Sequence, residues 1–183
     1  MSYSDEKVER WLYKWFYPFV DLRGDERILD LCCGDGVWSI GLMRRFPTLT
    51  VVGADVSQAA VKNANARVTD LGMAERARFF CYDCENNLPF QSSSFDLIFA
   101  RGLFVYNQHD MLRSGCLGLL EQWHGLLVPG GRFVAMYGSK PERFGAYTPP
   151  HETKGLPTNL SPRETPSIRP GMVHLGRHLE RLS

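Results

Sequence analysis

Short apolar runs alternate with helical patterns through the first three quarters of the chain. The runs are too short for helices and predict strands at 28–31, 50–55, 78–83, 95–101 and 132–137. Apolar residues at i, i+3 and i+4 spacing predict helices over about 37–45, 58–71 and 111–127. Strands that alternate with helices form a parallel sheet with helices on both faces, so the pattern predicts an α/β fold.

The N-terminal segment predicts one more helix, from Ser4 to about Val20. Ser4 can cap it, and Pro18 lies close to its stop. Its apolar residues form one stripe at helical spacing: Val8, Trp11, Leu12, Trp15, Phe16 and Phe19. The stripe predicts a helix that packs on the sheet; the alternative is that some of its aromatic residues cover a ligand pocket.

The first predicted strand leads into a glycine turn. Gly34 and Gly36 follow the apolar run, and helical spacing resumes at Val37. Glycine tolerates positive φ and lets a ligand approach bare backbone, and the free N–H groups of the following helix point at that place. Open α/β sheets bind nucleotides at such a junction, although a Gly-x-Gly after a strand is by itself a weak signal.

Charged residues end several of the predicted strands. Asp55 ends the second strand, 19 positions beyond Gly36, and Asp83 ends the third. That separation from the glycine turn is close to the one at which nucleotide folds place a carboxylate against ribose hydroxyls. Because parallel strands end at one edge of the sheet, we expect Asp30, Asp55, Asp83 and Arg101 to share that edge.

The pattern changes after residue 138. Seven of the eleven prolines lie beyond this point, where periodic apolar spacing almost disappears. We therefore predict a domain over 1–138 and an irregular tail over 139–183, in which 172–182 forms at most one short helix or strand.

Composition excludes several functional classes. A chain of 183 residues has room for about one domain, and its net charge of +1 gives no basic surface for nucleic acid or an anionic membrane. No apolar run reaches the length of a membrane span, and the acidic start lacks a leader peptide. The odd number of cysteines, five, indicates free thiols and a cytoplasmic location.

Five segments in order resemble the class I S-adenosylmethionine-dependent methyltransferases, over about residues 26–138. They are Ile-Leu-Asp30-Leu-Cys32-Cys33-Gly34-Asp35-Gly36, Val-Val-Gly-Ala-Asp55-Val56-Ser57, Tyr82-Asp83 with Leu88-Pro89-Phe90, Phe95-Asp96-Leu-Ile, and Leu126-Leu127-Val128-Pro129-Gly130-Gly131. The resemblance implies a Rossmann-like, doubly wound, mostly parallel sheet of order 3-2-1-4-5. It also implies S-adenosylmethionine as cofactor and methyl transfer to a small-molecule or biosynthetic-intermediate acceptor.

The resemblance also assigns roles to individual residues. Gly34 and Gly36 would face the methionine end of the cofactor, and Asp30 would help to hold its amino group. Asp55 would accept from the ribose hydroxyls, and Val56 would pack on the adenine. The remaining positions follow the third and fourth strands: Asp83 accepting from the adenine amino group, Cys84 beside it, and Arg101 with Gly102 near the sulfonium.

Two departures from the family pattern stand out. Cys32 occupies the place of the first loop glycine, where a small side chain fits if φ stays negative. The family usually adds two strands after the fifth, and the tail offers no convincing candidate for either. An uncovered fifth strand would favour a homodimer.

Three residues at or after the end of the fourth strand are candidate catalytic residues: Arg101, Tyr106 and His109. Asn107 lies among them, and Arg101 suits an anionic group of the acceptor. A methyl transfer depends mainly on positioning, and a base is needed only when the nucleophile holds its proton tightly. The sequence does not identify a residue that would act as this base.

Other interpretations remain open. The fold could bind S-adenosylmethionine without methylating, as a regulatory, structural or inactive partner subunit. A nicotinamide-dependent oxidoreductase would need a third glycine or alanine where Ser39 stands. Cys81 and Cys84 have metal-ligand spacing, but residues three apart on a strand face opposite ways, so we expect no metal site.

Overall fold

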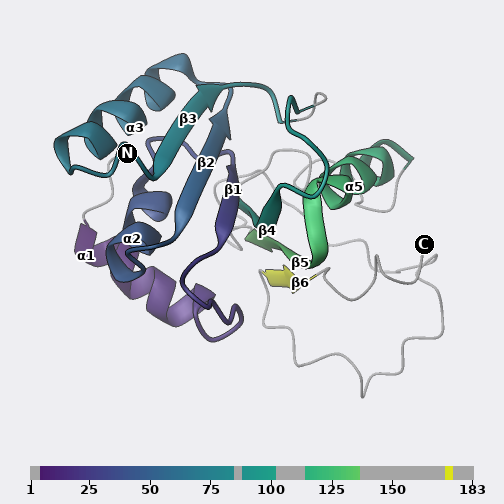
Figure 1. Cartoon of the computed structure of the whole chain (residues 1–183), viewed down its shortest axis with the longest axis horizontal. Helices are drawn as coiled ribbons and strands as arrows, with labels where there is room; N and C mark the ends of the chain where they lie inside the picture. The colour runs from purple at the N-terminus through teal and green to yellow at the C-terminus, as the bar shows by residue number, and fades with distance from the viewer. Residues whose placement is uncertain (1–4, 85–87, 102–113, 137–171, 175–183) are drawn as a thin grey trace, which may run out of the picture.

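A single six-stranded sheet organises the chain. The computed structural model describes residues 5–84, 88–101, 114–136 and 172–174. The strands are β1 (Arg27–Leu31), β2 (Thr50–Asp55), β3 (Ala77–Cys81), β4 (Phe95–Arg101), β5 (Leu127–Met136) and β6 (Met172–His174). Their order is β3-β2-β1-β4-β5-β6, and the first five run parallel (Figure 1). The predicted order 3-2-1-4-5 is therefore confirmed.

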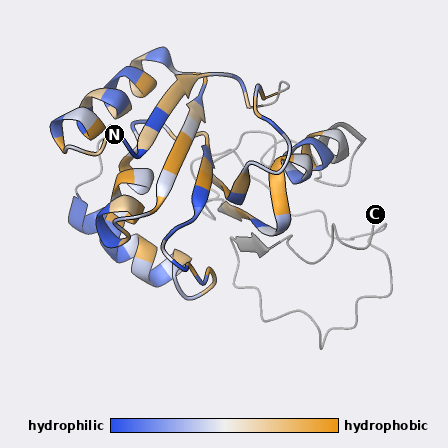
Figure 2. Cartoon of the chain, viewed as in Figure 1, coloured by the Kyte–Doolittle hydropathy of each residue, from blue (hydrophilic) through white to orange (hydrophobic). Residues whose placement is uncertain are grey.

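Helices cover both faces of this sheet. On one face lie α1 (Asp5–Trp11), a π-helical turn (Leu12–Phe16), α2 (Val37–Arg45) and α3 (Gln58–Asp70). On the other face lies α5 (Ser114–Leu126), which buries Leu120, Trp123 and Leu126. Hydrophobic residues concentrate on the strands, while hydrophilic ones lie on the outer turns of α1 and α3 (Figure 2).

The central strand β1 separates two hydrophobic clusters. Ile28 belongs to the cluster under α2 and α3, whereas Leu29 and Leu31 belong to the cluster under α5. This alternation follows the period of two in a strand and places Asp30 on the α2 face. Parallel strands covered on both faces are expected to be apolar throughout, so a carboxylate at this position is an exception.

The N-terminal helix differs from its prediction. The amide of Tyr17 donates to the carbonyl of Leu12 at 2.9 Å, which widens one turn to π geometry. Val8, Leu12 and Phe16 are buried as predicted, but Trp11 and Phe19 are about 40% exposed. The wider turn keeps residues four apart on one face and rotates the neighbouring row outward.

Strand β5 is longer than predicted. The strand was expected to begin at residue 132, but 128–131 already lies inside β5, as an irregularity between the pairs Phe95–Leu127 and Leu97–Arg132. Gly130, at φ 76°, supplies the backbone conformation that this bulge needs.

The tail contributes one short strand to the sheet. Val134, Ala135 and Met136 pair antiparallel with His174, Val173 and Met172. Sequence analysis allowed one short helix or strand over 172–182, but it did not expect that segment to extend the sheet beside the fifth strand. A three-residue strand in a proline-rich context has too little periodicity to show in the sequence. Since β6 covers β5 here, an uncovered edge no longer argues for a dimer.

Candidate active site

The turn after β1 has the backbone of a ligand-binding loop. Gly34 and Gly36 have φ of 56° and 72°, and α2 begins at Val37 without a side-chain cap. A β-carbon on Gly36 would lie 3.0 Å from the ring of Phe79 and 3.1 Å from Ala64. Glycine is therefore required at position 36 both by its positive φ and by the lack of space for a side chain. A β-carbon on Gly34 would have nothing within 4 Å.

Cys32 corrects one expectation about this loop. Its φ was expected to stay negative, but it is 58°, in the left-handed region that favours glycine. A cysteine in this conformation carries a strain of about 1 kcal/mol. Its thiol is hydrogen-bonded to Cys84 and packs with the cluster under α5. That hydrogen bond, followed by burial, raises the pKa of the Cys32 thiol.

Asp30 is a buried carboxylate with one strong donor. It is 2% exposed, and the Ser39 hydroxyl donates to its Oδ2 at 2.5 Å. Burial raises the pKa of Asp30 to about 7, against the Ser39 hydrogen bond and the positive charge of Arg101, which lower it. The nearby charge of Asp55 raises it further. Asp30 can thus accept a cationic amine, which would favour its ionised form.

Asp55 ties the end of β2 to the glycine loop. Its Oδ2 accepts from the Gly34 amide at 2.8 Å and its Oδ1 from the Ser57 amide at 2.9 Å. A carboxylate has about four acceptor positions, so both oxygens can still accept from hydroxyls. Val56, next along the chain, is 69% exposed and offers an apolar face beside this carboxylate.

The residues after β3 lie next to the same edge. Asp83 is exposed, and Cys84 is buried with its thiol 3.6 Å from the Ala54 carbonyl. Cys81, which has metal-ligand spacing to Cys84 in the sequence, is exposed, and its thiol lies 3.5 Å from the Val56 carbonyl. Within the described residues, no three His, Cys, Asp or Glu side chains are grouped to hold a metal ion.

Arg101 and Trp38 form the side of the site next to β4. The guanidinium carbon of Arg101 lies 5.0 Å from the centre of the Trp38 ring. Trp38 is 4% exposed, meets Trp11 edge-on at 6.1 Å and tilts against Phe99 at the same distance. Among the described residues, its buried indole Nε1 has no hydrogen-bond partner, as is also the case for Nε1 of Trp123 on the α5 face.

Sequence analysis did not single out Trp38 or Ser39 as site residues. Both lie in the first turn of α2, directly after Gly36, where they were assigned only to the helix. The signal available in the sequence was the Ser39 hydroxyl, which follows the acid Asp30 by nine positions. Gly102, Tyr106, Asn107 and His109 lie outside the described residues.

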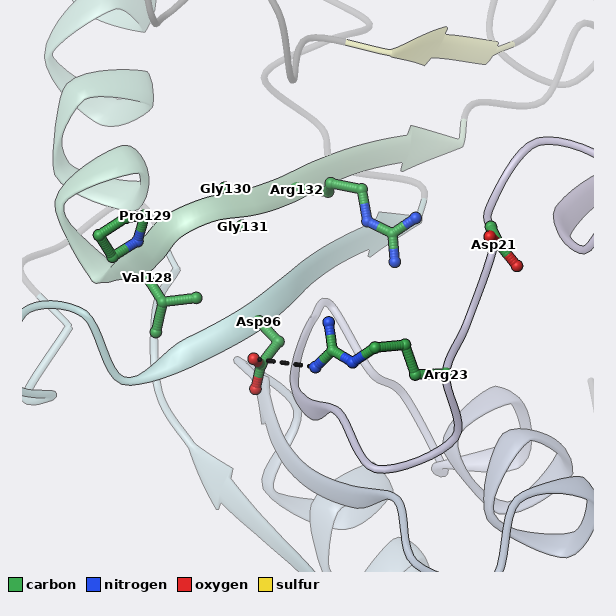
Figure 3. Close-up of a pocket in the computed structure, with 8 residues that line it drawn as sticks. All are labelled: Asp21, Arg23, Asp96, Val128, Pro129, Gly130, Gly131 and Arg132. Atoms are coloured by element: carbon green, nitrogen blue, oxygen red, sulfur yellow. Dashed lines mark hydrogen bonds and ion pairs between the residues drawn. The ribbon is translucent and has the colours of Figure 1, made fainter.

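A separate hollow lies at the opposite end of the sheet. It has a volume of about 350 Å³ and is lined by Asp21, Arg23, Asp96, Val128, Pro129, Gly130, Gly131 and Arg132 (Figure 3). Asp96 is near the start of β4 and pairs with Arg23 at 3.4 Å. Buried Glu26 accepts from the Arg23 and Gly24 amides and lies 3.9 Å from Arg132. These charges pair with one another, so we interpret this hollow as structural.

The comparisons with known proteins agree with this geometry. A model of a methyltransferase domain matches residues 28–131. A demethylmenaquinone methyltransferase from Lactiplantibacillus plantarum is 30% identical over 125 residues, 68% of this chain and 50% of that protein. The ubiquinone/menaquinone biosynthesis C-methyltransferase UbiE from Ectopseudomonas mendocina is 35% identical over 127 residues, 66% of this chain and 44% of that protein. The chain thus spans about half the length of the curated relatives it matches.

A solved structure with this fold shows that the architecture also serves other chemistry. The [4+2]-cyclase SpnF superposes with a TM-score of 0.58 and 25% identity, over 72% of this chain and 45% of that one. In the part of the chain that the structure describes, no helix is long and apolar enough to cross a membrane.

Proposed function

The chain belongs to the methyltransferase domain family, and from that premise we propose that it transfers a methyl group from S-adenosylmethionine to a quinol-like small molecule. Two curated relatives named for quinone biosynthesis support this class of acceptor. The bound cofactor supplies an electrophilic methyl group on a sulfonium. The sulfur–carbon bond breaks with its electron pair kept by sulfur, a ring carbon gains the methyl group, and the acceptor loses one proton.

The donor and acceptor groups at the carboxyl edge of the sheet fit this cofactor. Asp30 suits its amino group, and the free N–H groups in the first turn of α2 suit its carboxylate. Asp55 suits the ribose hydroxyls, and Val56 with Asp83 and the backbone at Cys84 suits the adenine. Cys32 packs toward Cys84 and the α5 side, which leaves Gly34 open.

One observation carries the proposal. The Gly34 amide donates to Asp55 at 2.8 Å, so the glycine loop and the acid at the end of β2 form one unit. Asp30 lies in the next strand, close enough to Asp55 for their charges to interact. Two carboxylates and bare backbone at one strand edge form the arrangement that a nucleoside with a cationic tail requires.

Calorimetry with S-adenosylmethionine and S-adenosylhomocysteine tests the cofactor. We expect both to bind, and Asp55→Asn to weaken binding about tenfold or more by removing a charged acceptor. Asp96→Asn is the matched control, because Asp96 also accepts from a backbone amide, that of Arg27 at 3.0 Å, but at the opposite end of the sheet. No binding to the wild-type protein would contradict the proposal.

Methyl transfer is tested with demethylmenaquinone reduced to its quinol. We expect the product to gain 14 mass units, one CH₂, in a cofactor-dependent manner. Cofactor binding without transfer to this or related quinols would favour the alternative, a protein that keeps the fold and the cofactor but does not methylate.

A further inference from the structure

Arg101 lies at the methionine end of the candidate site. It ends β4, one position beyond the pair Ala100–Leu31, and so stands level with the start of the glycine turn. Its side chain turns to the α2 face, because it reaches Trp38 and is close enough to Asp30 to lower the pKa of that carboxyl. Arg101 is therefore beside the groups proposed to hold the amino-acid part of the cofactor.

Trp38 fixes the position of this guanidinium. Its ring is almost completely buried and is held between Trp11 and Phe99. A guanidinium over an indole face is attracted by the ring's electrostatic field and keeps its positive charge. Arg101 is only partly buried, so its charged group remains at the edge where a substrate would arrive.

The charges around Arg101 favour an anion. The cofactor carries an ammonium, a sulfonium and one carboxylate, and Arg101 adds another cation beside Asp30. With Asp30 ionised, these groups sum to one positive charge, and Asp55, whose charge also reaches Asp30, ends β2, two strands away from Arg101. An anionic oxygen on the acceptor adds the opposite charge beside Arg101 and can accept hydrogen bonds from its guanidinium.

We propose that Arg101, seated on the face of Trp38, binds the deprotonated oxygen of the methyl acceptor, which is therefore a phenolate or an enolate. This inference rests on the proposed function and names its substrate class. The hydroxyl proton passes to water when the acceptor binds. After methyl transfer, the ring carbon loses its proton to water and the oxygen is protonated again, so the acceptor loses one proton in all. Trp38 is a positioning residue that acts through Arg101.

The test measures the ionisation of a bound phenol instead of turnover. 4-Nitrophenol and 4-nitro-1-naphthol, each at a pH below its pKa, are titrated with the free protein and with the protein saturated with S-adenosylhomocysteine. The absorbance of the coloured anion reports the bound form. We expect wild-type protein to raise the anionic fraction, and Arg101→Gln to reduce the anion's affinity about tenfold or more.

Four variants separate the charge of Arg101, the aromatic ring beneath it and general stability. Arg101→Lys should keep part of the signal, because it keeps the charge but not the fork. Trp38→Leu should lose signal, while Trp38→Phe should keep most of it, since an aromatic face remains. Arg45→Gln is the matched control: Arg45 also lies over aromatic rings, 5.1 Å from that of Tyr13, but in the last turn of α2. It should bind the anion like the wild type.

The outcomes distinguish this inference from the proposed function. An unchanged signal in Arg101→Gln, or no anionic signal with either phenol, overturns the inference even if quinol methylation is found. A signal that depends on Arg101 in a protein that does not methylate supports the anion site and removes only the proposed function. Melting temperatures of all variants show whether a lost signal reflects unfolding.

Discussion

Asp30 is the residue whose surroundings most affect its chemistry. A carboxyl buried on the α2 face, with Ser39, Arg101 and Asp55 as its polar and charged neighbours, titrates near neutral pH. Its pKa of about 7 in the folded protein exceeds its ordinary value of 3.8. The folded state therefore binds more protons than the unfolded state between these values, and the free energy of unfolding falls as pH rises through them.

The ionisation of Asp30 should therefore change stability and cofactor affinity in opposite directions as the pH rises. Above pH 7, without cofactor, Asp30→Asn should raise the free energy of unfolding by about 1–4 kcal/mol, and below pH 4 the gain should vanish. Cofactor affinity of the wild type should increase as pH rises through 7, with uptake of the ligand releasing a proton. Urea unfolding at several pH values and calorimetry in buffers of different ionisation enthalpy measure both. A wild-type affinity that does not change with pH would contradict the assignment.

Cys32 allows a second test at a single position. Because its φ is 58°, Cys32→Gly should be more stable than Cys32→Ala by about 1 kcal/mol, although both lose the same thiol contact with Cys84. Cys81 is the control, since it lies in β3, where glycine should be less stable than alanine by about 0.5–1 kcal/mol. Denaturant unfolding of the four variants gives both differences, and the same order at both positions would refute the strain.

At the scale of elements, β2 and β3 pack closely through a contact between Gly53 and the ring of Phe79, which the missing side chain of glycine permits. A β-carbon on Gly53 would lie 2.3 Å from a ring atom of Phe79. The ring therefore packs flat against bare backbone at the core of the α2 face.

Gly53→Ala should accordingly destabilise the protein by about 1–3 kcal/mol through overpacking. Phe79→Leu removes the ring atoms that clash, so the double variant should be more stable than the sum of the two single changes predicts. Chemical denaturation of the four proteins gives the coupling. Strict additivity would mean that the ring is not the obstacle.

Elements with a strong local signal were predicted well. The predicted bounds of β2 and β4 agree with the structure. The π-helical turn and the bulge in β5 were missed, because each depends on packing and on hydrogen bonds that local spacing does not specify. Among site residues, Asp30 and Asp55 could be located by strand position. Trp38 could not, since its role depends on contacts with Arg101 and Trp11.

For the whole molecule, β6 matters because it pairs with the last parallel strand. Its Val173 opposes Ala135 in an antiparallel register. An unpaired strand at that position would offer backbone donors and acceptors to another chain.

Val173→Pro should weaken this pairing and increase self-association, because proline cannot donate to a neighbouring strand. Val173→Thr keeps the backbone donor and serves as the control. Light scattering over a concentration series compares the two variants. Equal masses for both would show that β6 does not protect the edge.

The register of β6 has a consequence for how this protein can diversify. Met136, where β5 ends, stands opposite both Arg101 on β4 and Met172 on β6. The ends of β5 and β6 therefore lie next to the residue proposed to meet the acceptor, and β1 and β4 separate them from the end of β2. Substitutions at these strand ends can alter which molecules are accepted while the nucleoside-binding residues stay unchanged, so new specificities can evolve at one margin of an otherwise constant framework.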